Sequence, residues 1–364
     1  MSALLALAGT ACLAAEPEVS DVFVAGKDGF PSIRIPSVIV TRKGTVLAFA
    51  EGRAAHADQA RNKIILKRSA DGGCTWGEQR VVADDGNRCL NNPCAVVEQS
   101  SGRVWLMFQS YPVGMRETSK ELQTGYKGDR VLRSLIAHSD DDGLTWSKPE
   151  DITSSCKRPD TIRTVASGPG LGIQLQRGPH AGRLVMPFNE RTGTSCEVFV
   201  VYSDDRGATW HMGAIAPGGV GNELQVVELS DGSLRMNSRR SGGAKLRKTS
   251  VSRDGGQTWT PLADVADLPD PTCMASVLRH GDALYFSGPF AAKRENGTIA
   301  VSSDDGQTWP VHKTLFPGSF GYSVLTALPD GTLGCFFETD GANRLVFARF
   351  TLDWLNTAAG PKTP

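Results

Sequence analysis

The chain has 364 residues, of which 40% are hydrophobic, and its lysines and arginines balance its aspartates and glutamates at 39 each. A net charge of zero argues against a nucleic-acid-binding protein and against a protein held on an anionic membrane surface. Beyond the N-terminal segment there is no long apolar run, so the sequence predicts no membrane span. Forty glycines and twenty prolines favour many short strands joined by turns.

Residues 1–15, "MSALLALAGTACLAA", are small and apolar and are followed by the polar "EPEVSD". This pattern predicts an export signal with a small-residue cleavage zone, and hence a secreted or periplasmic protein. The segment lacks a basic start, so either the signal is atypical or the true start lies upstream. A disordered or packed N-terminal tail is the alternative. A lipoprotein site at Cys12 is disfavoured because Gly9 stands where that motif has leucine.

The other seven cysteines are scattered and odd in number, which is not typical of a disulfide framework. Cys89 and Cys94 are close enough in sequence to bridge, and buried free thiols are the alternative. No CxxC motif or histidine cluster indicates a metal site. We therefore expect neither a metal nor an organic cofactor.

Five copies of one polar motif follow strand-like apolar runs: "SADGGCTW" at Ser69, "SDDDGLTW" at Ser139, "SDDRGATW" at Ser203, "SRDGGQTW" at Ser252 and "SSDDGQTW" at Ser302. All fit S-x-D-x-G-x-T-W, at roughly the spacing of propeller blades. The aspartate can accept backbone N–H groups across a turn, the glycine supplies a positive φ, and the tryptophan can pack between neighbouring sheets. We interpret the motifs as structural turns, because a calcium loop would need a distal bidentate glutamate.

Six further apolar runs alternate with turn signals: "GTVLAFAEGR", "GRVWLMFQSY", "GRLVMPFNER", "GSLRMNSRR", "ALYFSGPF" and "GTLGCFFETD". They predict an all-β fold, a six-bladed β-propeller with four-stranded antiparallel blades. Five motifs suit six blades because the ring closes by mixing strands from both ends of the chain. We expect "DVFVA" from Asp21 to pair with "RLVFARF" from Arg344, within a single domain over residues 21–356.

A fold of this kind does not define a function, so the informative residues are polar ones where the scaffold would favour neutral or apolar ones. These are Arg34 in "FPSIRIPSVIV", Arg53 and Asp58 in "FAEGRAAHADQARNKIIL", Glu223 in "GVGNELQVVELSDG", Arg239 in "LRMNSRR", Arg294 in "GPFAAKRENGTIAVSSDDG", Tyr322 in "FPGSFGYSVLTALPDG" and Glu338 in "GCFFETDG".

Taken singly, each residue also has a structural interpretation: an ion pair of Arg34 with Glu51 or Glu338, a solvated turn at Asp58, a strand entry at Glu223 and a core aromatic at Tyr322. Strand alternation places Arg239 and Arg240 on opposite faces, so one of them at most faces a site. Arg294 competes in the same way with Lys293.

The order of these elements resembles the exo-α-sialidases (neuraminidases) of the bacterial and animal type, in which an "RIP" motif precedes repeated Asp-boxes of the form S-x-D-x-G-x-T-W. The likeness extends over nearly the whole chain after about residue 20, through "EGR" with a later aspartate, "GPGLGIQL…GRLVMPF", "NELQVVEL…LRMNSR", "RENGTIAVSSDDG" and "GYSVL…FFE". The boxes alone are shared by many propellers. Their combination with three ordered arginines and a Tyr–Glu pair is far more specific.

The resemblance implies a catalytic domain in which Tyr322 is the nucleophile, Glu223 its base and Asp58 the acid/base. It also implies that three arginines clamp the carboxylate of sialic acid: Arg34, Arg239 (matched through "MNSR") and Arg294. Glu338 would fix Arg34, and Arg53 would contact the 4-hydroxyl of the sugar.

The chemistry of the substrate supports this assignment. Sialic acid carries a carboxylate on its anomeric carbon, and guanidinium groups stay charged and pair with carboxylates in bidentate fashion. That carboxylate would repel an acidic nucleophile, whereas a neutral phenol can approach, which is why sialidases use tyrosine among the retaining glycosidases. Free tyrosine has a pKa of about 10, so a base must draw off its proton during attack.

The predicted partners are sialylated glycans or free sialosides. A trans-sialidase, an intramolecular form releasing an anhydro product, and an enzyme preferring the deaminated sugar KDN remain alternatives. The loop "YPVGMRETSKELQTGYKGD" would help to decide between the first two by controlling access of water. A non-catalytic glycan- or protein-binding propeller is disfavoured, because it would have lost Tyr322, Glu223 or an arginine.

Overall fold

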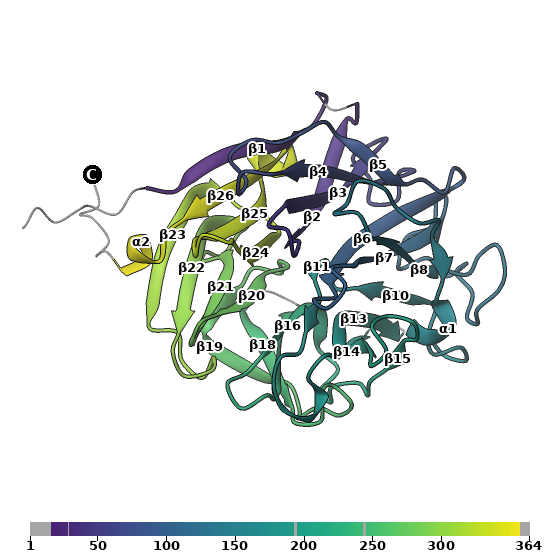
Figure 1. Cartoon of the computed structure of the whole chain (residues 1–364). Coiled ribbons are helices and arrows are strands. Elements are labelled where there is room, and N and C mark those ends of the chain that lie inside the picture. The colour runs from purple at the N-terminus through teal and green to yellow at the C-terminus, as the bar shows by residue number, and fades with distance from the viewer. Residues whose placement is uncertain (1–15, 28, 193–194, 243–244, 357–364) are drawn as a thin grey trace, which may run out of the picture.

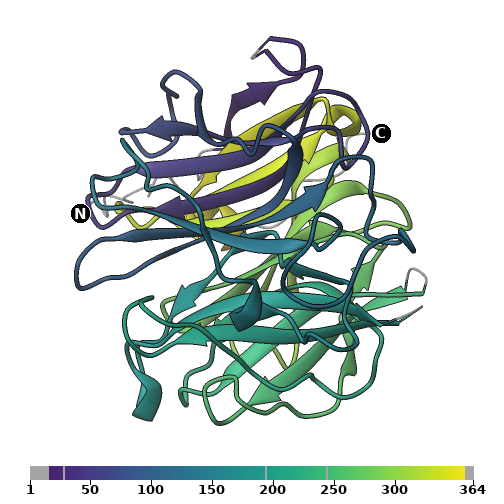
Figure 2. The same cartoon turned by 90° about the vertical axis from the view of Figure 1, so that its right-hand side faces the viewer.

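A computed structural model describes residues 16–27, 29–192, 195–242 and 245–356. Residues 1–15, for which an export signal is predicted, lie outside this part. Six β-sheets surround a common axis, as the ring of labels in Figure 1 shows, and Figure 2 shows the same ring from the side. The predicted six-bladed β-propeller of four-stranded antiparallel blades is confirmed.

The blades are numbered here in chain order, and their strands are given from the centre outward. The first is β2 (Ser32–Val40), β3 (Val46–Arg53), β4 (Lys63–Ser69) and β5 (Arg80–Ala83); the second β6 (Arg88–Val97), β7 (Val104–Pro112), β8 (Arg133–Ser139) and β9 (Glu150–Asp151); the third β10 (Thr164–Ser167), β13 (Leu184–Thr192), β14 (Ser195–Ser203) and β15 (His211–Met212). The fourth is β16 (Gly221–Glu228), β17 (Leu234–Arg240), β18 (Lys245–Ser252) and β19 (Ala263–Asp270); the fifth β20 (Ser276–His280), β21 (Ala283–Pro289), β22 (Glu295–Ser302) and β23 (Val311–Ser319); the sixth β24 (Ser323–Ala327), β25 (Leu333–Thr339), β26 (Arg344–Phe350) and β1 (Glu18–Val24).

Two short strands depart from the regular pattern. β11 (Gly170–Leu171) adds to the second blade, parallel to β6, and β12 (Ile173–Gln174) adds to the third blade beside β13. Both come from the glycine-rich "GPGLGIQL" segment. The described helices are short: α1 (Thr153–Cys156), α2 (Leu352–Asn356) and the 3-10 turns η1 (Gly178–His180) and η2 (Asp340–Ala342).

The ring closes as predicted, because β1 pairs antiparallel with β26 in the sixth blade. Asp21 lies opposite Val346 and Phe23 opposite Leu345. Asp21 also forms an ion pair with Arg344. In Figure 1 the purple N-terminal strand therefore runs beside the yellow C-terminal ones. The sixth blade lacks the repeated motif because its outermost strand comes from the other end of the chain.

Each repeated motif forms the same hydrogen-bonded turn. In the first, the Asp71 carboxylate accepts the Thr75 backbone N–H at 2.9 Å and the Ser69 hydroxyl at 2.7 Å. The Ser69 hydroxyl in turn accepts the Gly73 N–H at 2.8 Å. Hydrogen bonds from Thr75 lower the pKa of Asp71 to about 2. The predicted acceptor role of the aspartate and the positive φ of the glycine, 91° at Gly73, are both confirmed.

The glycine of each turn also contacts the preceding blade. A Cβ on Gly73 would lie 2.3 Å from Phe347 of the sixth blade, and one on Gly207 would lie 2.3 Å from Trp105 of the second. Trp76 packs edge-on against the same Phe347, with ring centroids 5.5 Å apart. The turn formed by the motif therefore packs against the preceding blade, in agreement with the predicted packing between neighbouring sheets.

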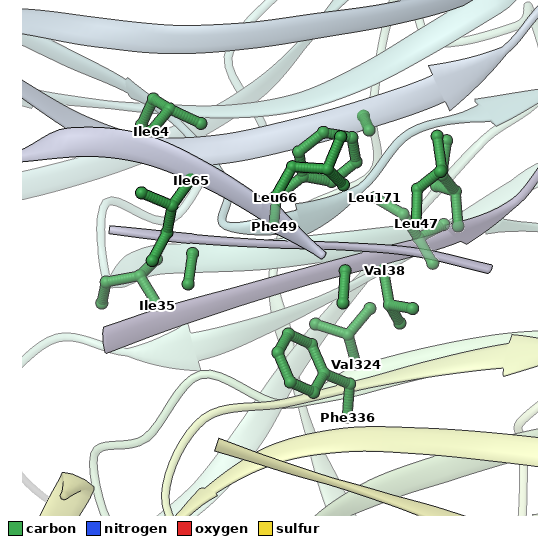
Figure 3. Close-up of a cluster of buried hydrophobic side chains, with 14 of the residues drawn as sticks. Ile35, Val38, Leu47, Phe49, Ile64, Ile65, Leu66, Leu171, Val324 and Phe336 are labelled. Carbon is green, nitrogen blue, oxygen red and sulfur yellow. The ribbon is translucent and has the colours of Figure 1, made fainter. Parts of the chain in front are cut away.

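Apolar side chains fill the space between blades. Figure 3 shows one such cluster, in which Val38 of the first blade lies near Val324 and Phe336 of the sixth. These side chains are fully buried, so the hydrophobic effect stabilises the junction where the ring closes.

The seven cysteines of the described part are free thiols, including Cys89 and Cys94. Among the described residues, no helix has the length and hydrophobicity needed to cross a membrane.

Candidate active site

Three inner strands carry a β-bulge at the same end of the propeller. The pairing of β2 slips between Arg34 and Ser37, that of β16 between Gly221 and Leu224, and that of β6 between Asn91 and Cys94. Bulges re-aim side chains and are frequent beside active sites. These three turn polar residues toward the propeller axis.

The "RIP" motif is the clearest case. Ile35 has φ +64°, a left-handed conformation that is strained for a β-branched residue. Its backbone N–H donates to the Glu338 carboxylate at 2.9 Å, which holds the strained turn. Pro36 has no N–H to leave unpaired at the bulge. The result is that Arg34 faces the axis.

A cavity of about 360 Å³ opens between these strands, within the ~300–1,000 Å³ typical of small-molecule sites. It is lined by seven of the eight residues predicted from the sequence: Arg34, Arg53, Asp58, Glu223, Arg239, Arg294 and Tyr322. The eighth, Glu338, lies behind Arg34 and lines a neighbouring cavity of about 400 Å³ together with His56, Ser319 and Gly341.

Arg34 is held by Glu338 in a bidentate ion pair. Its Nε and Nη2 donate to the two carboxylate oxygens at 3.1 and 3.0 Å. Burial would raise the pKa of Glu338, but Arg34 and the backbone N–H groups of Ile35 and Tyr322 outweigh burial and hold that pKa below its usual range. The alternative pairing of Arg34 with Glu51 does not occur. The guanidinium is thus charged and fixed.

Tyr322 and Glu223 are in direct contact. The phenolic O–H donates to the Glu223 carboxylate, with oxygen–oxygen distances of 2.6 and 2.7 Å. Arg239 Nη1 lies 2.5 Å from Glu223 Oε2 and 3.0 Å from the phenolic oxygen. Burial and the Glu223 charge raise the pKa of Tyr322 well above 10, so the phenol is neutral at rest. The carboxylate is placed to accept its proton.

The three arginines meet around this phenol. The guanidinium carbons of Arg34 and Arg294 lie 5.3 and 5.2 Å from the Tyr322 ring centroid, and Arg239 contacts its oxygen. Arg294 donates to the Thr272 carbonyl at 2.7 Å, but no acidic side chain in the described part of the chain pairs with it. The cavity therefore presents a positive charge that a bound anion would compensate.

Both ambiguities between neighbouring residues are resolved by the geometry. Arg239 lines the cavity, while the backbone N–H of Arg240 donates to buried Asp270 at 2.6 Å. Arg294 lines the cavity, while Lys293 is exposed. Of each pair, the residue selected from the sequence is the one that lines the cavity.

Asp58 lies on the exposed loop 54–61, and its side chain is 65% exposed. Its carboxylate accepts from Arg53 Nη1 at 2.8 Å and lies 3.6 Å from Arg34 Nη1. Arg53 is almost fully buried and also pairs with Glu51 at 2.7 Å. Arg53 therefore reaches the cavity with its guanidinium already shared by two carboxylates.

Several cavity residues were not identified from the sequence. Asn91 and Asn92 come from the β6 bulge, Asn189 from β13, and Tyr111 from β7. The two asparagines before a proline in "LNNPC" were the available signal, since asparagine adopts the left-handed conformation readily and Asn92 has φ +56°.

Part of the loop 111–129, predicted to influence access to the site, does border it. The side chains that line the cavity include Arg116, Glu117 and Thr118, and Glu117 accepts a hydrogen bond from Arg191 at 2.7 Å.

Across residues 16–27, 29–192, 195–242 and 245–356, no group of three histidine, cysteine, aspartate or glutamate side chains is placed to hold a metal ion.

Fold and site thus define a β-propeller with an arginine-lined, tyrosine-containing central pocket. Residues 44–335 match the family model described as BNR repeat-like domain. The chain is 39% identical over 361 residues to a sialidase of Micromonospora viridifaciens, covering 94% of this chain and 55% of that protein. It is 29% identical to an exo-alpha-sialidase of Aspergillus fumigatus, covering 90% of this chain and 86% of the relative. The chain belongs to the BNR repeat-like family, and the curated relatives that it resembles are named sialidases or exo-alpha-sialidases.

Solved structures agree with this placement. The Hadza microbial sialidase Hz136 superposes with a TM-score of 0.82 at 29% identity, over 90% of this chain and 67% of that one. An intramolecular trans-sialidase of Ruminococcus gnavus superposes with a TM-score of 0.80 over 93% of this chain and 99% of that one, but its 21% identity supports the fold alone. The chain spans just over half the length of the Micromonospora relative and 62% of a Bacteroides fragilis sialidase.

Proposed function

We propose that this protein is an exo-α-sialidase that hydrolyses terminal α-linked sialic acids of glycans, with retention of configuration through a covalent intermediate on Tyr322. The observation that carries the proposal is the Tyr322–Glu223 hydrogen bond of 2.6 Å inside a cluster of three arginines. A buried phenol with its own base and a surrounding positive charge fits a substrate that is anionic at its reacting carbon.

In the first step the substrate carboxylate lies among Arg34, Arg239 and Arg294. The Tyr322 oxygen attacks the anomeric carbon, and Glu223 takes the phenolic proton as the new C–O bond forms. The bond to the leaving alcohol breaks, and Asp58 supplies the proton that the alcohol needs. Because the phenol becomes nucleophilic only as its proton leaves, the raised pKa of Tyr322 is compatible with this role.

In the second step water attacks the same carbon from the face that the alcohol left. Asp58 now accepts a proton from water, the bond to Tyr322 breaks, and Glu223 returns its proton to the phenolate. Two displacements restore the original configuration, so sialic acid is first released as its α-anomer.

The test is hydrolysis of a fluorogenic aryl α-sialoside, in both the N-acetyl and the KDN form, by wild type and Tyr322→Phe. We expect wild type to be active and the variant to lose at least about a thousandfold in kcat, since it has no nucleophile. Tyr285→Phe is the matched control, because Tyr285 is a buried tyrosine outside the cavity. A folded wild type inert on both sugars contradicts the proposed hydrolysis, and an active Tyr322→Phe contradicts the proposed nucleophile.

Product analysis by NMR separates the proposed reaction from its neighbours. Early appearance of the free α-anomer supports retaining hydrolysis. A β-anomer appearing first contradicts the covalent intermediate. An anhydro product, or transfer to added lactose in place of release, would assign the chain to an intramolecular or transferring form.

A further inference from the structure

The loop that carries Asp58 poses a problem for the function proposed above. Residues 54–58 are all exposed, yet a general acid must stay within hydrogen-bond reach of the leaving oxygen. The two ends of the loop are different, because Arg53 and Asn62 are each only 1% exposed. Any device that fixes Asp58 must therefore lie at the base of the loop.

Two buried amide side chains converge on the backbone carbonyl of Asp58. Asn62 Nδ2 lies 2.5 Å from this oxygen and Asn91 Nδ2 lies 2.8 Å from it. The same two nitrogens reach the buried Glu51 carboxylate at 3.3 and 3.2 Å. Asn91 belongs to the second blade, so its contact ties the loop of the first blade to the neighbouring one.

The Asp58 carboxylate is also linked to Glu51, through the side chain of Arg53. Arg53 Nε donates to Glu51 at 2.8 Å, and Arg53 Nη1 donates to Asp58 at 2.8 Å. Glu51 has no exposed surface, and the Asn92 backbone N–H adds a further donor at 2.7 Å. Burying a carboxylate is destabilising unless several donors satisfy it. Three of the side chains that donate to Glu51, those of Arg53, Asn62 and Asn91, also donate to Asp58.

The loop also has hydrogen bonds that do not involve Asp58. The Ala54 N–H donates to the Ala60 carbonyl at 3.1 Å, and the Ala60 N–H donates to Asn62 Oδ1 at 3.1 Å. The two amide donors instead meet on the one acidic residue of the loop that faces the cavity. We propose that Asn62, Asn91 and Glu51 are positioning residues that hold Asp58 in place to protonate the leaving group. This inference rests on the proposed sialidase function.

The test compares kcat/KM on two substrates for wild type, Asn62→Ala and Asn91→Ala. A 4-methylumbelliferyl α-sialoside has an acidic leaving group that departs with little protonation, whereas the alcohol of sialyllactose needs the acid. We expect losses of roughly tenfold to a hundredfold on sialyllactose, part of the ~10²–10⁴-fold that a positioned acid supplies. On the aryl substrate we expect a loss of about threefold or less.

Asn237→Ala is the matched control, because Asn237 is also a buried asparagine of a blade and accepts from Arg247 at 2.8 Å, away from Asp58. It should leave the ratio of the two kcat/KM values unchanged. In an Asp58→Ala background, Asn91→Ala should no longer change that ratio, since its effect runs through Asp58. If an alanine variant does not fold, Asn62→Ser and Asn91→Ser serve as milder replacements.

Equal losses on both substrates in the folded variants would overturn the inference, because they indicate a merely structural role. So would an effect of Asn91→Ala on the ratio that persists without Asp58. A wild type that cleaves neither substrate is a different result, and it counts against the proposed function.

Discussion

Replacing Glu338 by glutamine tests the ion pair that fixes Arg34. In the wild type, Arg34 and the Ile35 N–H both donate to the Glu338 carboxylate. The glutamine amide has nearly the same shape, but it turns its NH2 donor toward one of these two donors. Removing one partner of a buried ion pair costs ~3–5 kcal/mol. Because the Arg34 side chain keeps 20% exposure and lies 3.6 Å from Asp58, we expect the lower end, about 3 kcal/mol at pH 7.

The assay is urea denaturation of wild type and Glu338→Gln over a series of pH values. The pKa of Glu338 is depressed in the folded state, so its stabilising effect is complete well above the ordinary glutamate pKa of about 4.3. The difference between the proteins should shrink as the pH falls below that value and through the folded-state pKa. The exposed pair of Asp140 and Arg103 gives the control, Asp140→Asn, at no more than about 1 kcal/mol. A Glu338 effect no larger than the control, or one that grows in acid, would refute the reasoning.

Three further outcomes are expected. Gly207→Ala should lower the free energy of unfolding by about 3 kcal/mol, because the added Cβ would clash with Trp105 of the preceding blade. Gly331→Ala is the control: Gly331 has φ +82° but open space around it, so we expect a cost of about 1 kcal/mol in the same denaturation assay. Equal costs for the two variants would contradict the inter-blade contact. Arg239→Lys should raise KM for a sialoside at least about tenfold, because Nη1 is already engaged by Glu223 and Tyr322 and lysine has no second nitrogen for the substrate carboxylate; an unchanged KM would exclude Arg239 from carboxylate binding. In a difference-absorbance titration, wild type and Tyr322→Phe should give the same phenolate signal up to about pH 10, because the pKa of Tyr322 is raised well above 10; an extra wild-type signal near neutral pH would disprove this.

The architecture could be predicted because its signals are local. Each repeated motif contains its own acceptor, hydroxyl and glycine within a few residues, as Ser69, Asp71 and Gly73 show. The pairing of β1 with β26 followed from the missing sixth motif. The short strands β11 and β12 could not be predicted, because two-residue pairings depend on where a glycine-rich segment passes its neighbours.

The site could be predicted where charged residues interrupt an apolar pattern, and missed where neutral ones do. Arg34 and Glu338 are conspicuous in their strands, and their order matched a known family. Asn62 and Asn91 are ordinary polar residues in sequence, and their importance arises only where the loop of one blade meets the bulge of the next. Such contacts are created by the ring and cannot be inferred from either segment alone.

Arg34 stands on the first inner strand of the ring, whereas Glu338 and Tyr322 belong to its last blade. During synthesis, a chain that has completed five blades holds its first arginine without the carboxylate that orients it and without the phenol it faces. The arginine cluster and the phenol that it surrounds therefore come together only once the sixth blade has been synthesised. A product truncated before that blade would lack the proposed active site, even if its earlier blades had folded.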